Sequence, residues 1–166
     1  MKILAAMALA AVSAFGQKVT VEFDESVDFS KFKTFAIRNG QLNSKNPALN
    51  SELIKKKIEA DIARYLSSRG LEQTDGRSDL NVRYTFGSGR KVEREVYPAG
   101  WRGWGTRVVR VPYAEGTLVI DLRDPSTKSL VWRGISREEK GDAAKIESKL
   151  DDMVKKAIEK YPPKTK

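Results

Sequence analysis

The chain contains neither cysteine nor histidine. These absences exclude disulfides, a cysteine nucleophile, a thiolate or imidazole metal site and a serine–histidine relay. Catalysis would have to use carboxylate, lysine, tyrosine or serine–lysine chemistry, and no residue of those types stands out. The sequence therefore predicts no catalytic residue, no metal site and no cofactor.

Acidic residues are fewer than basic ones, 22 against 31 in a chain of 166 residues, which gives a formal net charge of +9. That excess favours anionic partners such as phospholipid headgroups, lipopolysaccharide or nucleic acid. A positive charge also raises the solubility of an exported protein that has no specific anionic partner. Both interpretations stay open, and the length suits one domain with its own core.

Long apolar runs are also missing, because the longest one is short and N-terminal. Lys2 precedes the apolar residues 3–12, and small residues lie around position 16. This pattern predicts a signal peptide over residues 1–16, with cleavage before Gln17. The run is too short to cross a bilayer, so we expect no transmembrane helix in the mature chain. Without a cysteine as lipid acceptor, we expect an exported protein of the periplasm or the exterior, not a lipoprotein. An uncleaved N-terminal anchor is the alternative.

Residues 115–136 form the clearest structural pattern. Leu118, Ile120 and Leu122 alternate with polar residues at 117, 121 and 123, which predicts a strand with one apolar and one solvated face. The turn-forming residues 124–128 separate it from a second apolar run, 130–136. The segment is therefore expected to be an antiparallel hairpin.

Alternation also predicts strands at 18–24, 34–37 and 79–86, the last with a possible continuation at 91–96. Residues 39–50 are expected to be a loop, and residues 71–78 a polar connector. Apolar residues at the helical period predict helices over 51–69 and 142–160. We expect an α+β fold: a two-layer sandwich in which an antiparallel sheet carries both helices on one face, in the order β-β-α-β-β-β-α. A single domain would span 17–163, followed by a polar tail, 164–166.

Several segments, taken in order, resemble a known family. They are residues 28–35 (Asp-Phe-Ser-Lys-Phe-Lys-Thr-Phe), 79–84, a glycine- and tryptophan-rich passage, 115–121, 130–134 and the closing 161–163. Their order and spacing resemble DUF4136, a bacterial envelope family of unknown function, over nearly all of the mature chain. The resemblance implies an exported or envelope-attached protein and brings no catalytic residue. Many members look like lipoproteins, whereas this chain lacks the acceptor cysteine. Three recurring residues have structural explanations: Asp121 as a strand residue, Trp132 as core, and Gly134 as a bulge or a close approach of another backbone.

The best candidate site is the passage 97–105 with the Arg107 that follows it, here called the Gly/Trp/Arg loop. Its candidate binding residues are Trp101, Arg102, Trp104 and Arg107. Indole rings suit surfaces that are apolar on one side and wet on the other, and guanidinium groups bind anions. Alternatively, the two indoles fold back onto the sheet edge and cover it.

We therefore expect an exported, non-catalytic binding module that meets an anionic lipid surface or an envelope protein. The alternative is a structural or assembly component of an envelope complex. Nucleic acid is disfavoured as a partner because export separates the protein from it. A carboxylate-dependent hydrolase is the least favoured option, since its candidates are more simply explained as cross-strand charge pairs: Glu93, Glu95, Glu115 and Asp121. Three acidic residues near the first strand do not have EF-hand spacing: Asp24, Glu25 and Asp28.

Overall fold

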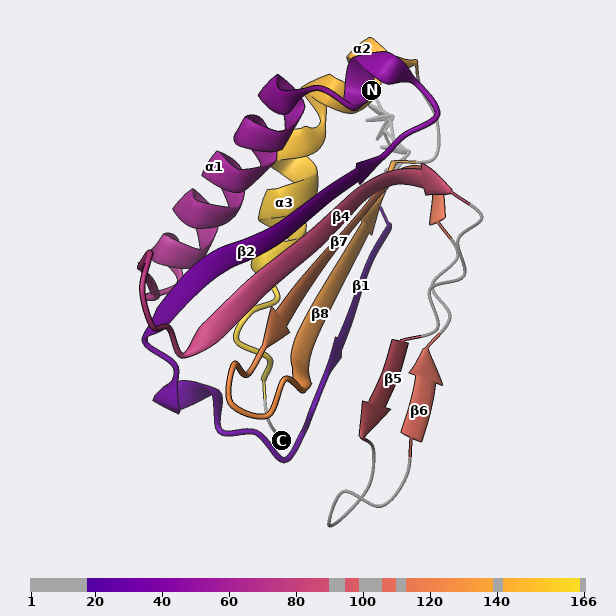
Figure 1. Cartoon of the computed structure of the whole chain (residues 1–166). Coiled ribbons are helices and arrows are strands. Elements are labelled where there is room, and N and C mark those ends of the chain that lie inside the picture. Colours follow the sequence, from indigo (N-terminus) through magenta and orange to yellow (C-terminus); the bar gives the residue numbers. More distant parts are fainter. Residues whose placement is uncertain (1–17, 90–94, 99–105, 110–112, 139–141, 165–166) are drawn as a thin grey trace, which may run out of the picture.

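The computed structural model describes residues 18–89, 95–98, 106–109, 113–138 and 142–164. The fold is α+β, with one six-stranded sheet and two main helices (Figure 1). The sheet contains β1 (Lys18–Phe23), β2 (Thr34–Asn43), β3 (Glu72–Gln73), β4 (Leu80–Gly89), β7 (Tyr113–Arg123) and β8 (Leu130–Arg137), in the spatial order β1-β8-β7-β4-β2-β3. A separate two-stranded ribbon consists of β5 (Glu95–Pro98) and β6 (Thr106–Val109). The helices are α1 (Glu52–Ser68), α2 (Ala143–Ser148) and α3 (Leu150–Ile158), with 3-10 turns at Phe29–Lys31 and Pro47–Leu49.

Helix α1 confirms the prediction over 51–69. The Ser51 hydroxyl accepts a hydrogen bond from the backbone N–H of Ile54 at 3.3 Å, which caps the first turn. Four apolar residues at the helical period are buried: Ile54, Ile58, Ile62 and Leu66. Gly70, at φ +87°, ends the helix in the left-handed region that favours glycine.

The predicted second helix, 142–160, is divided at Lys149 into α2 and α3. Asp142 caps α2 by accepting from the N–H of Lys145 at 2.9 Å. The apolar pattern did not reveal the division, because Ile146 of α2 and Leu150 of α3 are both buried and keep the same period.

The sheet is mixed, so the prediction of an antiparallel sheet was wrong for two of its pairings. Strands β1, β8, β7 and β4 pair antiparallel, whereas β2 pairs parallel with both β4 and β3. The reason is connectivity: α1 lies between β2 and β4 in the chain and carries the backbone across, so that β4 starts at the same end as β2.

Strand β2 is longer than predicted. It continues to Asn43 through residues expected to be a loop, with a register shift between Ile37 and Asn39. Pairing with β4 orders this polar segment, and Gly40 accommodates the ring of Tyr84, since a Cβ there would lie 2.3 Å from Tyr84 Oη. Strands β3 and β6 were also unforeseen, and β5 overlaps only the end of the possible continuation at 91–96, so the order along the chain differs in detail from the predicted one.

Helices α1 and α3 lie on one face of the sheet (Figure 1). The core lies between them and the inward side chains of the central strands, among them Val82, Phe86, Leu118 and Ile120. Aromatic rings close one end, where Tyr161 makes edge-to-face contacts with Phe29 at 5.8 Å and Trp132 at 5.9 Å between ring centroids.

Two segments that carry the family resemblance meet in space. Asp79 accepts hydrogen bonds from the backbone N–H groups of Lys33 (2.8 Å) and Thr34 (3.0 Å), and the Thr34 hydroxyl accepts one from the N–H of Asp79. These contacts join the start of β4 to the start of β2. The recurrence of the two segments thus has a structural explanation.

Candidate functional site

Most of the predicted Gly/Trp/Arg loop lies outside the described residues. Trp101, Arg102 and Trp104 belong to the range 99–105, which the description does not include. Arg107 lies on β6, where its backbone pairs with Tyr97 of β5. The structure therefore does not bring the four predicted binding residues together as a described site.

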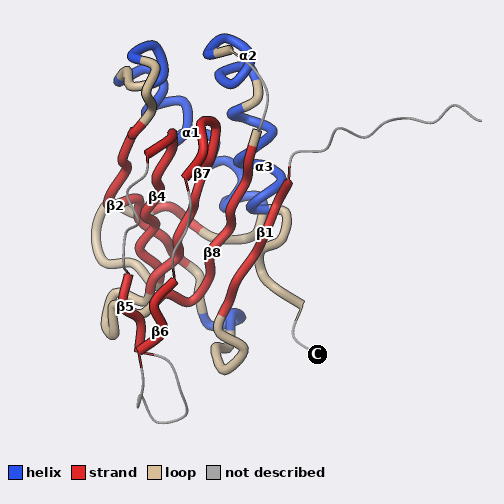
Figure 2. The backbone as a smooth tube through the Cα atoms, turned by 90° about the vertical axis from the view of Figure 1, so that its right-hand side faces the viewer, coloured by secondary structure: helices blue, strands red, loops and turns tan. Residues whose placement is uncertain are grey.

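The β5–β6 ribbon determines where this segment of the chain is anchored. Its two strands pair antiparallel from Glu95 with Val109 to Pro98 with Thr106. The last pair places Pro98 and Thr106, the described residues that flank 99–105, side by side. Figures 1 and 2 show the ribbon on the side of the sheet away from α1 and α3. We call this side the outer face.

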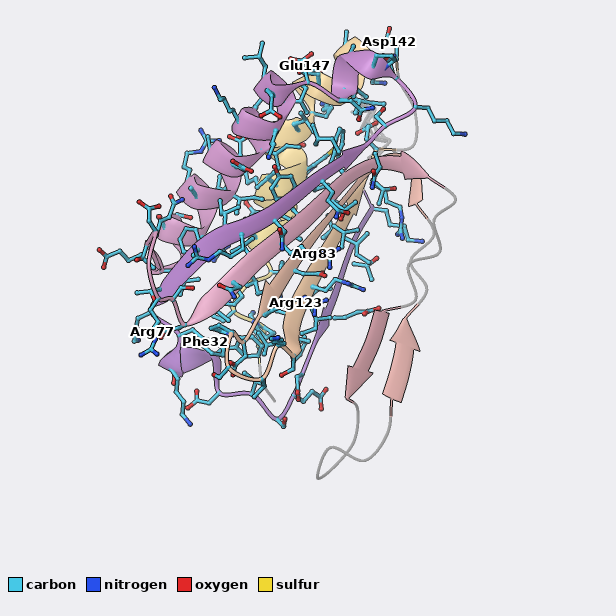
Figure 3. The ribbon with its side chains drawn as sticks, viewed as in Figure 1. Phe32, Arg77, Arg83, Arg123, Asp142 and Glu147 are labelled. Atoms are coloured by element: carbon cyan, nitrogen blue, oxygen red, sulfur yellow. The ribbon has the colours of Figure 1, made fainter. Side chains whose placement is uncertain are left out.

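A charge cluster lies on the outer face, and strand register explains its composition. Asp121 of β7 is paired with Arg133 of β8 on one side and with Arg83 of β4 on the other. Arg123 lies two residues further along β7, on the same face. Figure 3 shows Arg83 and Arg123 on neighbouring strands, on the side where the ribbon lies. We call these four residues the outer-face charge cluster.

The centre of the cluster is a buried ion pair. Arg133 donates from Nε to Oδ1 of Asp121 and from Nη2 to Oδ2, both at 2.7 Å, and the two residues are only 2% and 4% exposed. Nη2 of Arg123 lies 3.8 Å from the same Oδ2. A buried carboxylate is tolerable when it is paired in this bidentate geometry. Because both oxygens are engaged, the geometry favours the charge-pair interpretation of Asp121 over the acid–base one.

The outer face is not the solvated face that alternation predicted. Thr117 and Asp121 are buried, as are their apolar neighbours Val119 and Ile135. The prediction was wrong because polar side chains on a strand were assumed to face water, whereas here Asp121 and Arg133 satisfy each other within the sheet. Among the described elements, the β5–β6 ribbon lies on this side (Figure 2).

A second polar cluster, which the sequence analysis missed, joins α1 to α3. Arg64 donates to Asp61 at 2.8 Å and also bonds Asp151, and the Tyr65 hydroxyl donates to Asp151 at 2.8 Å. Burial raises the pKa of the Asp61 carboxyl, and the nearby Asp151 charge adds to that effect. Burial also raises the pKa of Tyr65. Helical spacing of Asp61, Arg64 and Tyr65 was visible in the sequence, but the partner on α3 was not.

The remaining candidates have structural roles where they are described. Asp24 and Asp28 each accept from the backbone N–H and the hydroxyl of a serine two residues later, which stabilises local turns. Within the described ranges, no three acidic side chains gather as a metal site. Glu93 lies outside those ranges, and Glu95 and Glu115 are described only as backbone in β5 and β7.

Gly134 is explained by a side chain rather than by a bulge or another backbone. A Cβ at Gly134 would lie 2.4 Å from Cη2 of Trp132, whose indole crosses that position. Trp132 is fully buried, as the sequence predicted. Among the described helices, none has the length and apolar character needed to cross a membrane.

Comparison with solved structures places the fold among known ones. A DUF4136 family protein from Bacteroides thetaiotaomicron is similar with a TM-score of 0.65 and 15% identity, covering 88% of this chain and 96% of that one. A PelC protein from Paraburkholderia phytofirmans, described as a dodecamer, is similar with a TM-score of 0.50 and 12% identity, covering 86% of this chain and 95% of that one. A PDZ domain protein from Parabacteroides distasonis is similar with a TM-score of 0.54 and 19% identity, and the match covers 90% of this chain and 36% of that one.

The sequence itself matches a protein-family model. No curated protein matches the chain. The model of DUF4136, a domain of unknown function, matches residues 19–163, nearly the whole of the described structure. The chain therefore belongs to the DUF4136 family.

Proposed function

We propose that this protein is a non-catalytic binding module of the bacterial cell envelope, exported by its N-terminal segment, that meets an anionic surface through the Gly/Trp/Arg loop. One observation supports it most directly: β5 and β6 pair as far as Pro98 and Thr106, so the two described residues that flank 99–105 lie side by side. The ribbon therefore fixes the positions of the two residues between which the candidate segment runs. Trp101, Arg102, Trp104 and Arg107 would contact the surface.

The physical basis is the combination of indole and guanidinium groups. Indole rings partition to the boundary between water and acyl chains, and arginine adds electrostatic attraction to anionic headgroups. The net charge of +9 supports attraction of the whole chain to such a surface. Binding should therefore require anionic lipid and weaken with salt.

Tryptophan fluorescence tests this proposal. The chain has three tryptophans, and Trp132 is buried in the core, so a blue shift on adding vesicles would report Trp101 and Trp104. We expect a shift with phosphatidylglycerol vesicles at low salt, a smaller one at high salt, and none with phosphatidylcholine. Replacing both loop tryptophans with phenylalanine should abolish it. Equal shifts with both lipids, or no shift at all, would contradict the proposal.

A matched pair of arginine variants separates the loop from general charge. Arg107→Ala and Arg77→Ala remove the same charge, and Arg77 is exposed at a different part of the molecule (Figure 3). We expect Arg107→Ala to weaken vesicle binding about fivefold, from about 1 kcal/mol per basic residue at an anionic surface. Arg77→Ala should weaken it less. Equal losses would show that only net charge matters.

A structural or assembly component of an envelope complex is the second candidate. It is supported by the PelC protein of similar fold, which is a dodecamer. Sedimentation velocity of the purified protein tests it: a concentration-dependent oligomer of defined size supports assembly. A monomer at every concentration argues against self-assembly.

A further inference from the structure

Strand β1 forms one edge of the sheet. Among the described strands it pairs only with β8, and Figure 2 shows it as the outermost strand on that side. Its apolar residues Val19 and Val21 are half-buried, whereas β8, with neighbours on both sides, is buried over six consecutive residues, 131–136. An edge strand offers backbone donors and acceptors to another strand.

The hydrogen-bond pattern shows which residues face outward. Asp24 donates from its backbone N–H to the carbonyl of Val131 at 3.0 Å, so the pair 24/131 is a hydrogen-bonded pair of the β1–β8 ladder. In an antiparallel ladder, hydrogen-bonded and non-hydrogen-bonded pairs alternate. Residues 18, 20 and 22 therefore direct their backbone N–H and C=O groups toward β8. Val19 and Val21 therefore direct their N–H and C=O groups toward the open edge.

The sequence of this edge is complementary to itself. Residues 18–22 read Lys-Val-Thr-Val-Glu. When a second copy of this segment runs antiparallel beside the first, the basic end meets the acidic end and the apolar residues meet each other. We propose that β1 is a self-association edge, at which β1 of a second copy pairs antiparallel around a two-fold axis at Thr20. Lys18 then lies opposite Glu22 of the second copy, and Val19 lies opposite Val21.

This register agrees with the outward-facing groups. Val19 and Val21 form hydrogen-bonded pairs across the interface, with each residue exchanging both backbone bonds with its opposite number. Thr20 lies opposite Thr20 of the second copy in a non-hydrogen-bonded pair. Because the symmetry repeats every contact, one interface contains two Val19–Val21 pairs and two Lys18–Glu22 pairs.

The charges within one molecule favour such a partner. Lys18 lies opposite Arg137 of β8, a like-charged pair that is unfavourable in a ladder. Glu22 from a second copy would place an opposite charge on the free side of Lys18. On the helix side, the two valine pairs would cover the half-buried apolar strip of both edges. This inference rests on the second candidate function and names its partner, a second copy of this chain.

Charge variants test the proposed pairing. Lys18→Glu and Glu22→Lys each replace two attractive pairs with repulsive ones and should raise the dimer dissociation constant about tenfold in sedimentation velocity. The double variant restores opposite charges and should recover dimerisation, and a mixture of the two single variants should form heterodimers. Lys56→Glu, on the exposed side of α1, is the control for net charge. Circular dichroism checks that each variant folds.

A thiol tests the register directly. The chain has no cysteine, so Thr20→Cys introduces a single thiol. Residues facing each other in a non-hydrogen-bonded pair have Cα atoms about 4.5 Å apart, within the range of a disulfide. We expect oxidised Thr20→Cys to form a covalent dimer, and Ser126→Cys, in the exposed turn between β7 and β8, to remain monomeric.

The outcomes separate the inference from the function on which it rests. A monomeric wild-type protein would overturn both. An oligomer that is insensitive to the charge variants and does not cross-link through Thr20→Cys would overturn the β1 edge and leave assembly through another surface. Neither result affects the vesicle experiment, which depends on the Gly/Trp/Arg loop.

Discussion

The indole of Trp132 occupies the space that a side chain at Gly134 would need. The indole crosses Gly134 on the helix side of β8 and meets Tyr161 edge to face. At the opposite face of the same strand, Arg133 holds Asp121 through two hydrogen bonds. Three consecutive residues of β8 thus combine an apolar contact, a buried ion pair and a position that tolerates no side chain. Packing and charge pairing therefore account for the residue types found at all three positions.

A methyl group at position 134 should be costly. Gly134→Ala would place a Cβ 2.4 Å from the Trp132 ring, and overpacking of this kind costs about 1–3 kcal/mol. We expect that loss in the free energy of unfolding from urea titration. Gly76→Ala is the control, because the nearest atom to its added Cβ lies 3.8 Å away. Similar losses for both variants would contradict the role assigned to Trp132.

The Asp121–Arg133 pair should contribute far more than a surface pair. Asp121→Asn removes the negative charge that Nε and Nη2 of Arg133 both bond at a side chain that is only 2% exposed, and breaking a buried pair costs about 3–5 kcal/mol. Asp152→Asn removes an exposed pair with Lys156 and should cost less than about 1 kcal/mol. Urea titration of both variants measures the difference. Equal effects would mean that the burial of the pair has no energetic importance.

At the scale of elements, polar contacts join segments that are distant in sequence. The Asp61–Arg64–Asp151 cluster links α1 to α3, and Asp79 links the start of β4 to β2. The two carboxyl groups differ in environment. Burial raises the pKa of Asp61 above 3.8, whereas hydrogen bonds from the N–H groups of Lys33 and Thr34 lower that of Asp79.

These opposite shifts predict opposite pH dependence. Because the pKa of Asp61 is higher in the folded state, its carboxyl stays protonated there at pH values at which the unfolded state has lost the proton. The contribution of Asp61 to stability therefore falls as pH rises above 3.8 through the folded pKa. Asp79 contributes stability above 3.8 that is lost as pH falls through its lowered pKa. Urea titrations of Asp61→Asn and Asp79→Asn from acid to neutral pH measure both.

Relative to wild type, the free energy of unfolding of Asp61→Asn should increase as pH rises through that window. The free energy of unfolding of Asp79→Asn, relative to wild type, should decrease as pH rises from acid. At neutral pH, exchanging the charged Asp79 acceptor for the neutral amide oxygen of asparagine should cost about 1–2 kcal/mol, because hydrogen bonds to a charged group are the stronger ones. Differences that stay constant with pH for either variant would show that its carboxyl pKa is the same in the folded and unfolded states.

At the scale of the whole molecule, stability should be graded across the sheet. Strand β7 has neighbours on both sides and directs Leu118, Ile120 and Leu122, all with no exposed surface, toward the helices. Strand β3 has only two exposed residues, and β1 lies at an edge. Opening of the centre therefore requires loss of the core, whereas opening of β3 does not.

Native-state hydrogen exchange should follow this gradient. We expect the backbone amides of β7 and β8 to exchange at least about a hundredfold more slowly than those of β3, with β1 in between. Exchange measured by NMR across a denaturant series would identify the amides that open only with global unfolding. Uniform protection of all six strands would contradict a graded sheet, and protection of β1 that rises with protein concentration would support the proposed edge pairing.

The sequence by itself determined the elements whose signals are local. Helix α1 begins at its serine cap and ends at Gly70, and the β7–β8 hairpin follows from its alternation and turn residues. Family membership was also visible, because the matching segments are spread along the chain. The cross-strand charge pair at Asp121 was predictable in kind, since a hairpin turn sets its register.

Only the tertiary structure decided what depends on contacts between distant segments. Parallel pairing with β4 extended β2 through asparagine and glycine residues whose own preferences favour a loop. Burial of the outer face turned polar residues expected to meet water into a paired cluster. Of the four predicted binding residues, only Arg107 falls within the described residues, on a strand that alternation did not reveal. Short-range periodicity records which side of an element is apolar, whereas the energy that selects its neighbours comes from residues far away in the chain.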